Sequence, residues 1–248
     1  MKEASKNEHL INHSFPVYKP DMDDLDDGEY KPLQMGTAAL LKHKNLYYIV
    51  TAGHVLDIED INHISIGEID ELQLDKCMVY YQHDEEIDAG VIKISKEQAE
   101  KITSEGKYMI DFDDQSKYIP KFRLEAGLIT IVGYPGSEQE LNDDEKKLKV
   151  VCKIITGPIL SSNVLNSASK LVVQYDRMRL VRQGSDQLVI GPYPPGMSGS
   201  PVWFNIDEDS EIMEFAGIAI QYSEDRNLVV IIRAEVILQL LEEVEKEA

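Results

Sequence analysis

The sequence is poor in cysteine, and this shortage excludes a class of protein. Only two cysteines, Cys77 and Cys152, occur among 248 residues, and they lie far apart in the chain. A small secreted domain held together by several disulfides is therefore excluded, and we expect two free thiols in a reducing compartment. Neither cysteine has a second Cys or His at metal-ligand spacing, so we expect no metal site and no cofactor.

Long apolar runs are also missing. No stretch approaches the roughly 20 apolar residues of a membrane-spanning helix, and the first ten residues lack the apolar segment of a secretory leader. These features predict a cytoplasmic protein with no membrane partner.

Basic residues are scarce beside acidic ones. Twenty-five Lys and Arg face 45 Asp and Glu, which gives a formal net charge of −20. A protein that binds nucleic acid without regard to sequence would approach a polyanion against its own field, so we expect no nucleic-acid partner. The acidic clusters lie between apolar runs, and we interpret them as solvated loops that favour solubility.

The apolar residues that are present fall into many short segments. A hydrophobic content of 43% can supply a core for one large domain or two small ones. Segments 35–41 and 46–50 predict a hairpin, Ser95 with Gln98 predicts a capped helix over 95–102, and the spacing at 236–244 predicts a terminal helix. Further strands are predicted at 127–133, 148–159, 171–175, 187–190, 202–205, 213–219 and 228–233. Regularly spaced short strands favour an all-β barrel or sandwich.

One stretch near the C-terminus suggests chemistry. In Gly196-Met197-Ser198-Gly199-Ser200-Pro201, small residues flank a serine, so the backbone can turn sharply and expose a hydroxyl. A serine nucleophile needs a histidine base that a carboxylate orients. His54 follows one apolar run, in Thr51-Ala52-Gly53-His54-Val55, and Asp88 opens another, in Asp88-Ala89-Gly90-Val91. The chain therefore supplies all three residue types.

These three motifs, in the order His54, Asp88, Ser198, resemble the trypsin-like serine peptidases of chymotrypsin fold, and more closely the bacterial short-loop branch. The order differs from that of other serine-hydrolase folds, and the resemblance spans roughly residues 35–232. Met197 departs from the pattern: it stands where secreted digestive members have the Asp that accepts a newly freed N-terminal amine. We therefore expect no activation of that kind.

The resemblance implies an all-β fold of two antiparallel six-stranded β-barrels, with a C-terminal helix packed on the second barrel. It implies a first barrel at 31–117 with His54 and Asp88, a second barrel at 118–233 with Ser198, and the helix at 234–248. Residues 1–30 are polar and lack sustained periodicity, so we interpret them as an N-terminal arm or a lead-in strand.

The resemblance also implies the chemistry. Ser198 would attack a peptide carbonyl, His54 would act as general base and then acid, and Asp88 would orient His54. The N–H groups of Gly196 and Ser198 would form the oxyanion hole. A serine endopeptidase with a protein or peptide substrate is thus the predicted function.

The family pattern also places a substrate pocket, at Pro192, Ala219, Gln221 and Tyr222. Pro192 stands where trypsin has an aspartate, so cleavage after Lys or Arg is not predicted, and a small or apolar pocket is favoured.

Alternatives remain open at this point. A catalytically latent fold that binds proteins and awaits an activating partner or complex fits the motifs, and so does a serine esterase. Asp84 is a second candidate for the triad acid, with more polar neighbours than Asp88. The other histidines, His9, His13, His43, His63 and His83, are interpreted as surface residues.

Overall fold

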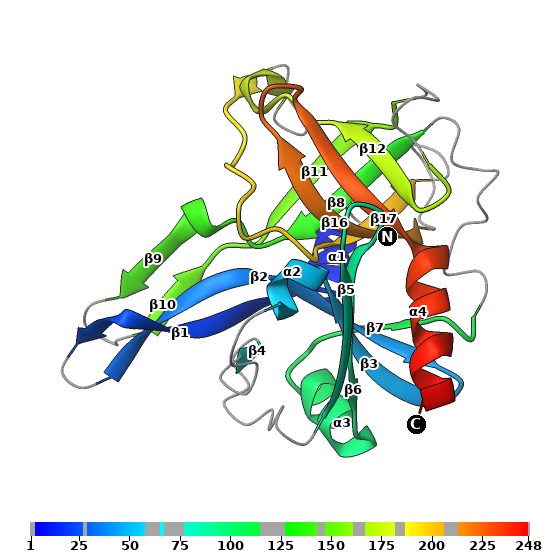
Figure 1. Cartoon of the computed structure of the whole chain (residues 1–248). Coiled ribbons are helices and arrows are strands. Elements are labelled where there is room, and N and C mark those ends of the chain that lie inside the picture. The colour runs from blue at the N-terminus through cyan, green and yellow to red at the C-terminus, as the bar shows by residue number, and fades with distance from the viewer. Residues whose placement is uncertain are drawn as a thin grey trace.

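The structure is a computed structural model that describes residues 3–26, 29–57, 65–66, 77–114, 127–142, 147–160, 167–181, 187–205 and 213–247. Figure 1 shows two β-sheets, one above the other, with a helix along one side of the molecule. His63, expected at the surface, lies outside the described residues.

The first sheet has seven strands from the N-terminal half of the chain. They are β1 (Phe15–Asp26), β2 (Glu29–His43), β3 (Leu46–Thr51), β4 (Ser65–Ile66), β5 (Met78–His83), β6 (Asp88–Ile94) and β7 (Met109–Asp111). The order is β4-β1-β2-β3-β6-β5, with β7 on β2. The predicted hairpin is β2–β3, and its turn residues Lys44 and Asn45 have φ of 48° and 62°, which is typical of tight hairpin turns.

The second sheet has six strands from the C-terminal half, all paired antiparallel. They are β8 (Leu128–Gly133), β11 (Lys153–Pro158), β12 (Lys170–Gln174), β15 (Pro201–Asn205), β16 (Met213–Ser223) and β17 (Leu228–Arg233), in the order β11-β8-β15-β16-β17-β12. A bridge from Ile159 to Val173 and a 3.0 Å hydrogen bond from Leu160 N–H to the Val172 carbonyl link the two edge strands.

The predicted architecture is confirmed in its coarse features, a mainly β chain with a C-terminal helix, and corrected in detail. The first sheet has seven strands instead of six, and β7 pairs parallel with β2, so it is not purely antiparallel. The reason lies after β6: helix α3 (Lys96–Ser104) carries the chain back, as parallel pairing requires. Helix α3 has the predicted capping box between Ser95 and Gln98.

The N-terminal segment expected as an arm has its own structure. It forms α1 (Glu3–Ile11), which was not predicted, and then β1, which pairs with β2 and is part of the first sheet. Phe15 and Val17 of β1 are buried in the core. Strand β1 therefore belongs to the first sheet, whereas α1 contacts β8 and β11 of the second sheet.

Smaller elements complete the described chain. They are α2 (Gly53–Leu56), the 3₁₀ turns η5 (Gly136–Glu138) and η6 (Arg177–Arg179), and two ribbons, β9 (Gln139–Asn142) with β10 (Lys147–Val150) and β13 (Leu180–Val181) with β14 (Leu188–Val189). The single strand predicted at 148–159 is thus two strands, β10 and β11, in different sheets. Within the described ranges, no helix is long and apolar enough to cross a membrane.

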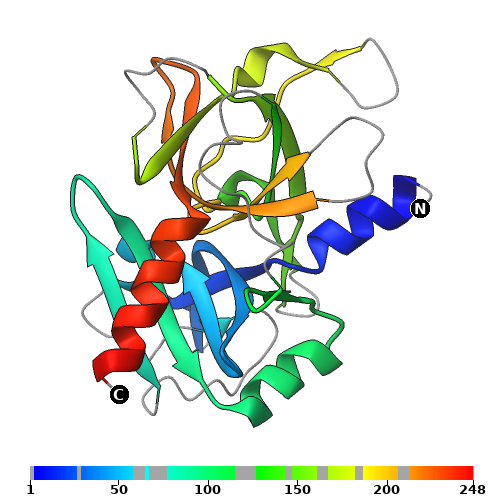
Figure 2. The same ribbon diagram turned by 90° about the vertical axis from the view of Figure 1, so that its right-hand side faces the viewer.

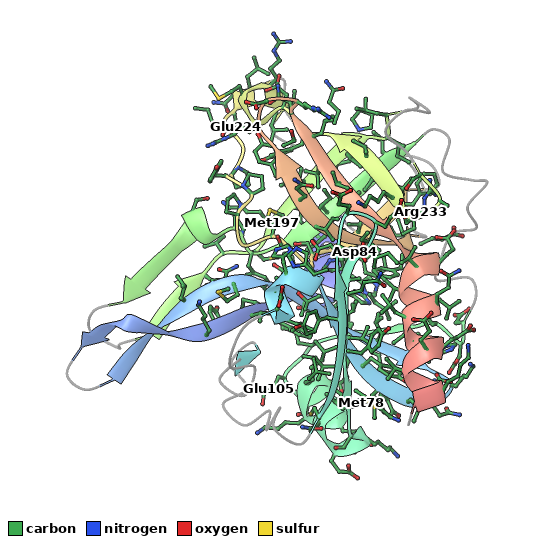
Figure 3. The ribbon with its side chains drawn as sticks, in the orientation of Figure 1. Met78, Asp84, Glu105, Met197, Glu224 and Arg233 are labelled. Carbon is green, nitrogen blue, oxygen red and sulfur yellow. The ribbon has the colours of Figure 1, made fainter. Side chains whose placement is uncertain are left out.

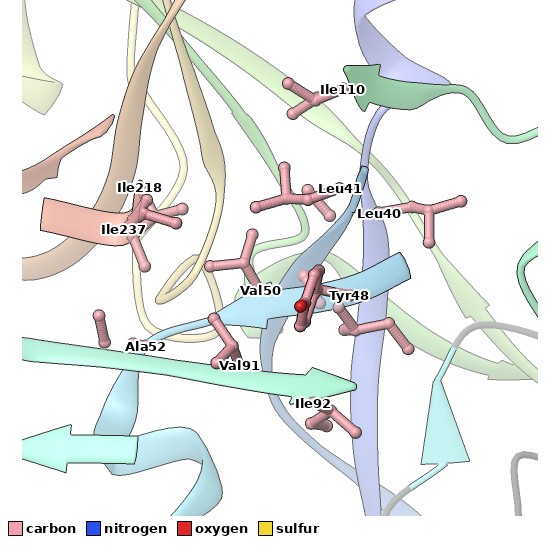
Figure 4. Close-up of a cluster of buried hydrophobic side chains, with 14 of the residues drawn as sticks. Leu40, Leu41, Tyr48, Val50, Ala52, Val91, Ile92, Ile110, Ile218 and Ile237 are labelled. Carbon is pink, nitrogen blue, oxygen red and sulfur yellow. The ribbon is translucent and has the colours of Figure 1, made fainter. Parts of the chain in front are cut away.

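Helix α4 (Ala234–Glu247) connects the two sheets. It continues directly from β17 and runs down beside the first sheet, as Figures 1 and 2 show. Its apolar residues are buried in the same cluster as Leu40, Val50 and Ile92 of the first sheet, and Figure 4 shows Ile237 beside Ile218 within that cluster. Each such side chain contributes about 1.5–3 kcal/mol when buried. The helix therefore packs on the first sheet as well as on the second, where it was expected.

Two histidines expected at the surface are buried instead. His13 is 6% exposed and packs edge-on against Trp203, with ring centroids 4.7 Å apart. His43 is 7% exposed, and its ring nitrogens lie 3.8 Å from Asp113 and 3.7 Å from Glu245. Neither environment can be read from the polar local sequence, because the neighbours come from distant segments.

Replacing Gly217 by Ala tests how closely β16 and β17 approach. Gly217 has φ of +143°, and a Cβ there would lie 1.8 Å from the Ile232 carbonyl oxygen. We expect Gly217→Ala to lower the free energy of unfolding by about 3 kcal/mol or more, measured by urea denaturation.

Gly106→Ala is the matched control for this substitution. Gly106 also has a positive φ, +84°, but a Cβ there meets nothing within 4 Å. Only the backbone penalty applies, so a loss of about 1 kcal/mol is expected. Equal losses in the two variants would contradict the close approach.

Candidate active site

His54 is delivered to the site by a single helical turn. Strand β3 ends at Thr51, and the four-residue α2 follows at once. Gly53 is required before the histidine, since a Cβ there would lie 2.3 Å from the Gln82 carbonyl oxygen of β5. The turn can therefore lie flat against the β5–β6 hairpin, where Asp88 begins β6.

Asp88 holds His54 with both oxygens of its carboxylate. Oδ1 accepts the His54 backbone N–H at 2.8 Å, and Oδ2 lies 2.7 Å from the ring Nδ1. Burial by itself would raise the pKa of the Asp88 carboxyl, but the two hydrogen bonds from His54 and the nearby histidine charges outweigh it and hold that pKa below its usual value. The group therefore stays ionised at neutral pH.

Asp84, the second candidate for the acid, is engaged elsewhere. Its Oδ1 accepts the N–H groups of Glu86 and Ile87 at 2.7 and 2.9 Å, and Oδ2 accepts the Gln82 side chain at 2.6 Å. Asp84 thus closes the turn between β5 and β6, and its carboxylate is used within that turn.

Ser198 sits in a loop that contacts both sheets. Gly196 and Gly199, on either side of it, have φ of +93° and +87°, in the left-handed region that favours glycine. The Gly199 N–H donates to the Ala219 carbonyl of β16 at 2.6 Å, and the Ser198 carbonyl accepts the Thr37 N–H of β2 at 2.7 Å. The loop is therefore fixed in position relative to His54.

The backbone N–H groups of this loop divide into two sets. Those of Met197, Gly199 and Ser200 donate to the carbonyl oxygens of Pro194, Ala219 and Met197, respectively. Those of Gly196 and Ser198, which were predicted to form the oxyanion hole, have no acceptor among the residues that the structure describes.

The three predicted catalytic residues line one cavity of about 600 Å³ between the two sheets. The hydroxyl of Ser198 donates to the Ile220 carbonyl at 3.4 Å, and no hydrogen bond joins it to His54 in the described part of the chain. Figure 3 labels Met197 and Asp84 in the region between the sheets, and both residues line the cavity.

Comparisons with solved structures place this site in a known type of fold. A serine endoprotease from Yersinia pestis superposes with a TM-score of 0.53 at 16% identity, over 98% of this chain and 66% of that chain. A structure concerned with the coupled folding and binding of the intrinsically disordered Sesbania mosaic virus VPg protein gives a TM-score of 0.53 at 13% identity, over 91% of this chain and 93% of the other. No protein family and no curated protein matches the sequence.

The chain shares its fold with both of these solved structures. At such low identity the likeness covers the fold alone and leaves the activity to the residues of the site.

Three of the four residues predicted to line a substrate pocket lie on the wall of this cavity. Ala219, Gln221 and Tyr222 line the cavity. Pro192 does not; its carbonyl accepts the Tyr175 hydroxyl at 2.7 Å, and the next residue, Tyr193, lines the cavity instead.

Several lining residues were not singled out from the sequence. Ile131 and Ile155 form part of an apolar floor, and His83 and Lys170 lie at the rim. Ile131 and Ile155 sit in ordinary strand patterns, so nothing local distinguishes them. His83 faces Asp88 across the turn between β5 and β6, a pairing that only the structure shows.

The described residues hold no group of three or more His, Cys, Asp or Glu side chains arranged to bind a metal ion.

Asp88→Asn tests the depressed pKa through stability. A carboxyl whose folded-state pKa is lowered stabilises the fold above its unfolded pKa, near 3.9, and this contribution is lost as pH falls through the folded value. We expect the variant to be less stable than the native chain by about 1–3 kcal/mol at pH 7. The difference should shrink below about pH 4. Urea unfolding at both pH values measures it, and a difference independent of pH would contradict the assignment.

Proposed function

We propose that this chain is a serine endopeptidase that hydrolyses peptide bonds through an acyl-enzyme on Ser198. One observation carries the proposal. The Asp88 carboxylate fixes both the backbone and the ring of His54, and this histidine shares a cavity with a serine held in a glycine-flanked loop. A base, its orienting carboxylate and an exposed hydroxyl are the parts that acyl transfer needs.

The orientation of the imidazole assigns its nitrogens. Because Nδ1 lies against the Asp88 carboxylate, it carries the proton, and Nε2 is the basic nitrogen that faces the cavity. Ser198 Oγ attacks the carbonyl carbon as Nε2 accepts the hydroxyl proton. The imidazolium, stabilised by Asp88, then protonates the leaving amine, and a water molecule repeats the sequence to release the acyl group.

The N–H groups of Gly196 and Ser198 receive the oxyanion. Their lack of acceptors within the described chain supports this role, since an occupied donor could not serve. Removing one donor from such a hole typically costs about 3–4 kcal/mol of transition-state stabilisation. Gly196 tolerates its φ of +93° because it has no Cβ.

The orientation of the Ser198 hydroxyl favours a second candidate function, that of a latent fold that binds proteins. The hydroxyl donates to the Ile220 carbonyl instead of to His54. For catalysis the side chain has to rotate about χ1, a motion that takes picoseconds to nanoseconds for an unhindered side chain. An obstacle to that rotation would leave the nucleophile latent until a partner or substrate binds.

Labelling with a fluorophosphonate probe distinguishes the two candidates. We expect the native chain to be labelled at Ser198, and Ser198→Ala and His54→Ala to lose at least about a thousandfold in labelling rate. The rate is read by in-gel fluorescence, with the site located by mass spectrometry.

Ser200→Ala is the matched control for these variants. Ser200 is fully buried and its hydroxyl has no partner among the described residues, so its removal leaves the nucleophile in place. It should label as the native chain does. A well-folded native chain that resists the probe would favour the latent protein, and ester turnover without peptide cleavage would favour an esterase.

The lining of the cavity predicts what precedes the cleaved bond. Ile131, Ile155, Ala219 and Val229 give it an apolar floor on the side of the second sheet. An ammonium placed there without a partner would lose its hydration. For fluorogenic peptides that differ only in Leu or Lys at this position, we expect kcat/KM to favour Leu by about a hundredfold. Equal rates, or a preference for Lys, would contradict an apolar pocket.

A further inference from the structure

The turn that carries His54 cannot hold its own position. A single turn of four residues lies far below the length at which a helix is stable alone, and the residue before it, Ala52, provides no side-chain cap. The position of His54 therefore depends on contacts that α2 makes with other elements. Asp88 supplies those at its N-terminal end.

A second imidazole and carboxylate fasten the other end of this turn. Asp57 follows α2 directly, and its Oδ2 lies 3.1 Å from the His83 Nδ1 of β5. Its Oδ1 accepts the Tyr81 hydroxyl at 3.2 Å. The turn is thus joined to the β5–β6 hairpin twice, by His54 to Asp88 and by Asp57 to His83.

The two pairs, His54 with Asp88 and His83 with Asp57, lie side by side, and each pair takes one residue from the α2 segment and one from the hairpin. His83 and Asp88 are register partners on β5 and β6, while His54 and Asp57 belong to the α2 segment. The rings of His54 and His83 lie 5.8 Å apart between centroids, tilted by 55°, and both line the cavity. A charge on one ring therefore acts on the other across a short distance.

The surroundings of His83 are mainly acidic. Asp57 faces it from the α2 segment, Asp88 from β6 and Asp84 from the adjoining turn, while His54 faces it across the pair. Across the cavity, Lys170 donates to the Glu85 carbonyl oxygen. The side chains of His83 and Asp57 are 44% and 52% exposed, so their pairing adds little to the free energy of unfolding of the whole chain. Its effect is local, on the position of α2 and on the neighbouring ring.

We propose that His83, held by Asp57, is a positioning residue that fixes α2 against the hairpin and sets the pH at which His54 gains its proton. Its catalytic consequence rests on the proposed peptidase function, but the coupling between the two rings does not. Protonated His83 offsets the Asp57 charge. Without that positive charge, the uncompensated carboxylate favours protonated His54.

The charge at position 83 can be varied while the hydrogen bond to Asp57 is kept. His83→Gln retains an N–H donor and is neutral, whereas His83→Lys retains a donor and a permanent positive charge. The imidazole titration of His54, followed by NMR of isotopically labelled histidine, should move to higher pH by about half a unit in His83→Gln. In His83→Lys it should lie at or below the native midpoint.

His9→Gln is the matched control. His9 is exposed at the end of α1, outside the cavity, and its loss should leave the His54 titration unchanged. Thermal unfolding checks that each variant is folded, and unfolding temperatures close to the native one are expected. A His54 midpoint that stays within about 0.2 units of the native value in both His83 variants would overturn the proposal.

The pH profile of probe labelling supplies the catalytic readout. The acid limb of the labelling rate should follow the NMR midpoint, so that on this limb His83→Gln reacts about threefold more slowly than the native chain at the same pH. If the native chain fails to label at any pH, the peptidase function fails, while the NMR titration still decides the coupling. An acid limb that stays unchanged while the NMR midpoint moves would overturn the catalytic role of His83.

Discussion

Thr37 joins the two halves of the site, and the geometry of the rest depends on it. This residue of β2 is fully buried, and each of its polar groups is used. Its N–H donates to the Ser198 carbonyl, its hydroxyl donates to the Gly196 carbonyl at 3.0 Å and accepts the Tyr134 N–H at 3.1 Å, and its carbonyl accepts the Thr51 hydroxyl at 2.7 Å. One threonine thus binds the loop of Ser198, the end of β8 and the end of the strand that leads to His54. Buried polar groups that are all paired define a unique arrangement, since a shift of either sheet would leave several of them unsatisfied.

Around Thr37, strand β2 and the Ser198 loop are packed so closely that no side chain could fit between them. A Cβ at Gly36 would lie 2.7 Å from the Ser198 carbonyl, and one at Gly199 would lie 2.0 Å from the Thr37 carbonyl. Backbone from β2 and backbone from the Ser198 loop are therefore in direct contact. Helix α4 adds a second connection, because it leaves the second sheet at β17 and buries its apolar face against the first. Together these contacts fix the positions of His54 and Asp88 relative to Ser198.

Local sequence predicted those features that depend on local physics. The β2–β3 hairpin, the capped α3 and the amphipathic α4 follow from turn residues, a capping box and helical spacing, and each is present. His54, Asp88 and Ser198 were found because each stands in a short motif after or within an apolar run. Thr37 and His83 carry no such signal, since their partners are distant in the chain. The parallel strand β7 was missed because three residues paired at an edge have no periodicity to detect.

The interior of the Ser198 loop shows how this chain departs from the secreted enzymes that its motifs resemble. Met197 is buried in the second core, with Ile129, Ile131 and Val202, and its side chain is apolar. The loop is therefore held by packing, by two glycines with positive φ and by the Thr37 hydrogen bonds, and not by an ion pair to an Asp at that position. The N-terminal segment is itself committed elsewhere, since β1 pairs with β2. These contacts hold the loop around Ser198 with an apolar side chain at position 197, and the prediction that no newly freed amine activates the chain follows from that residue.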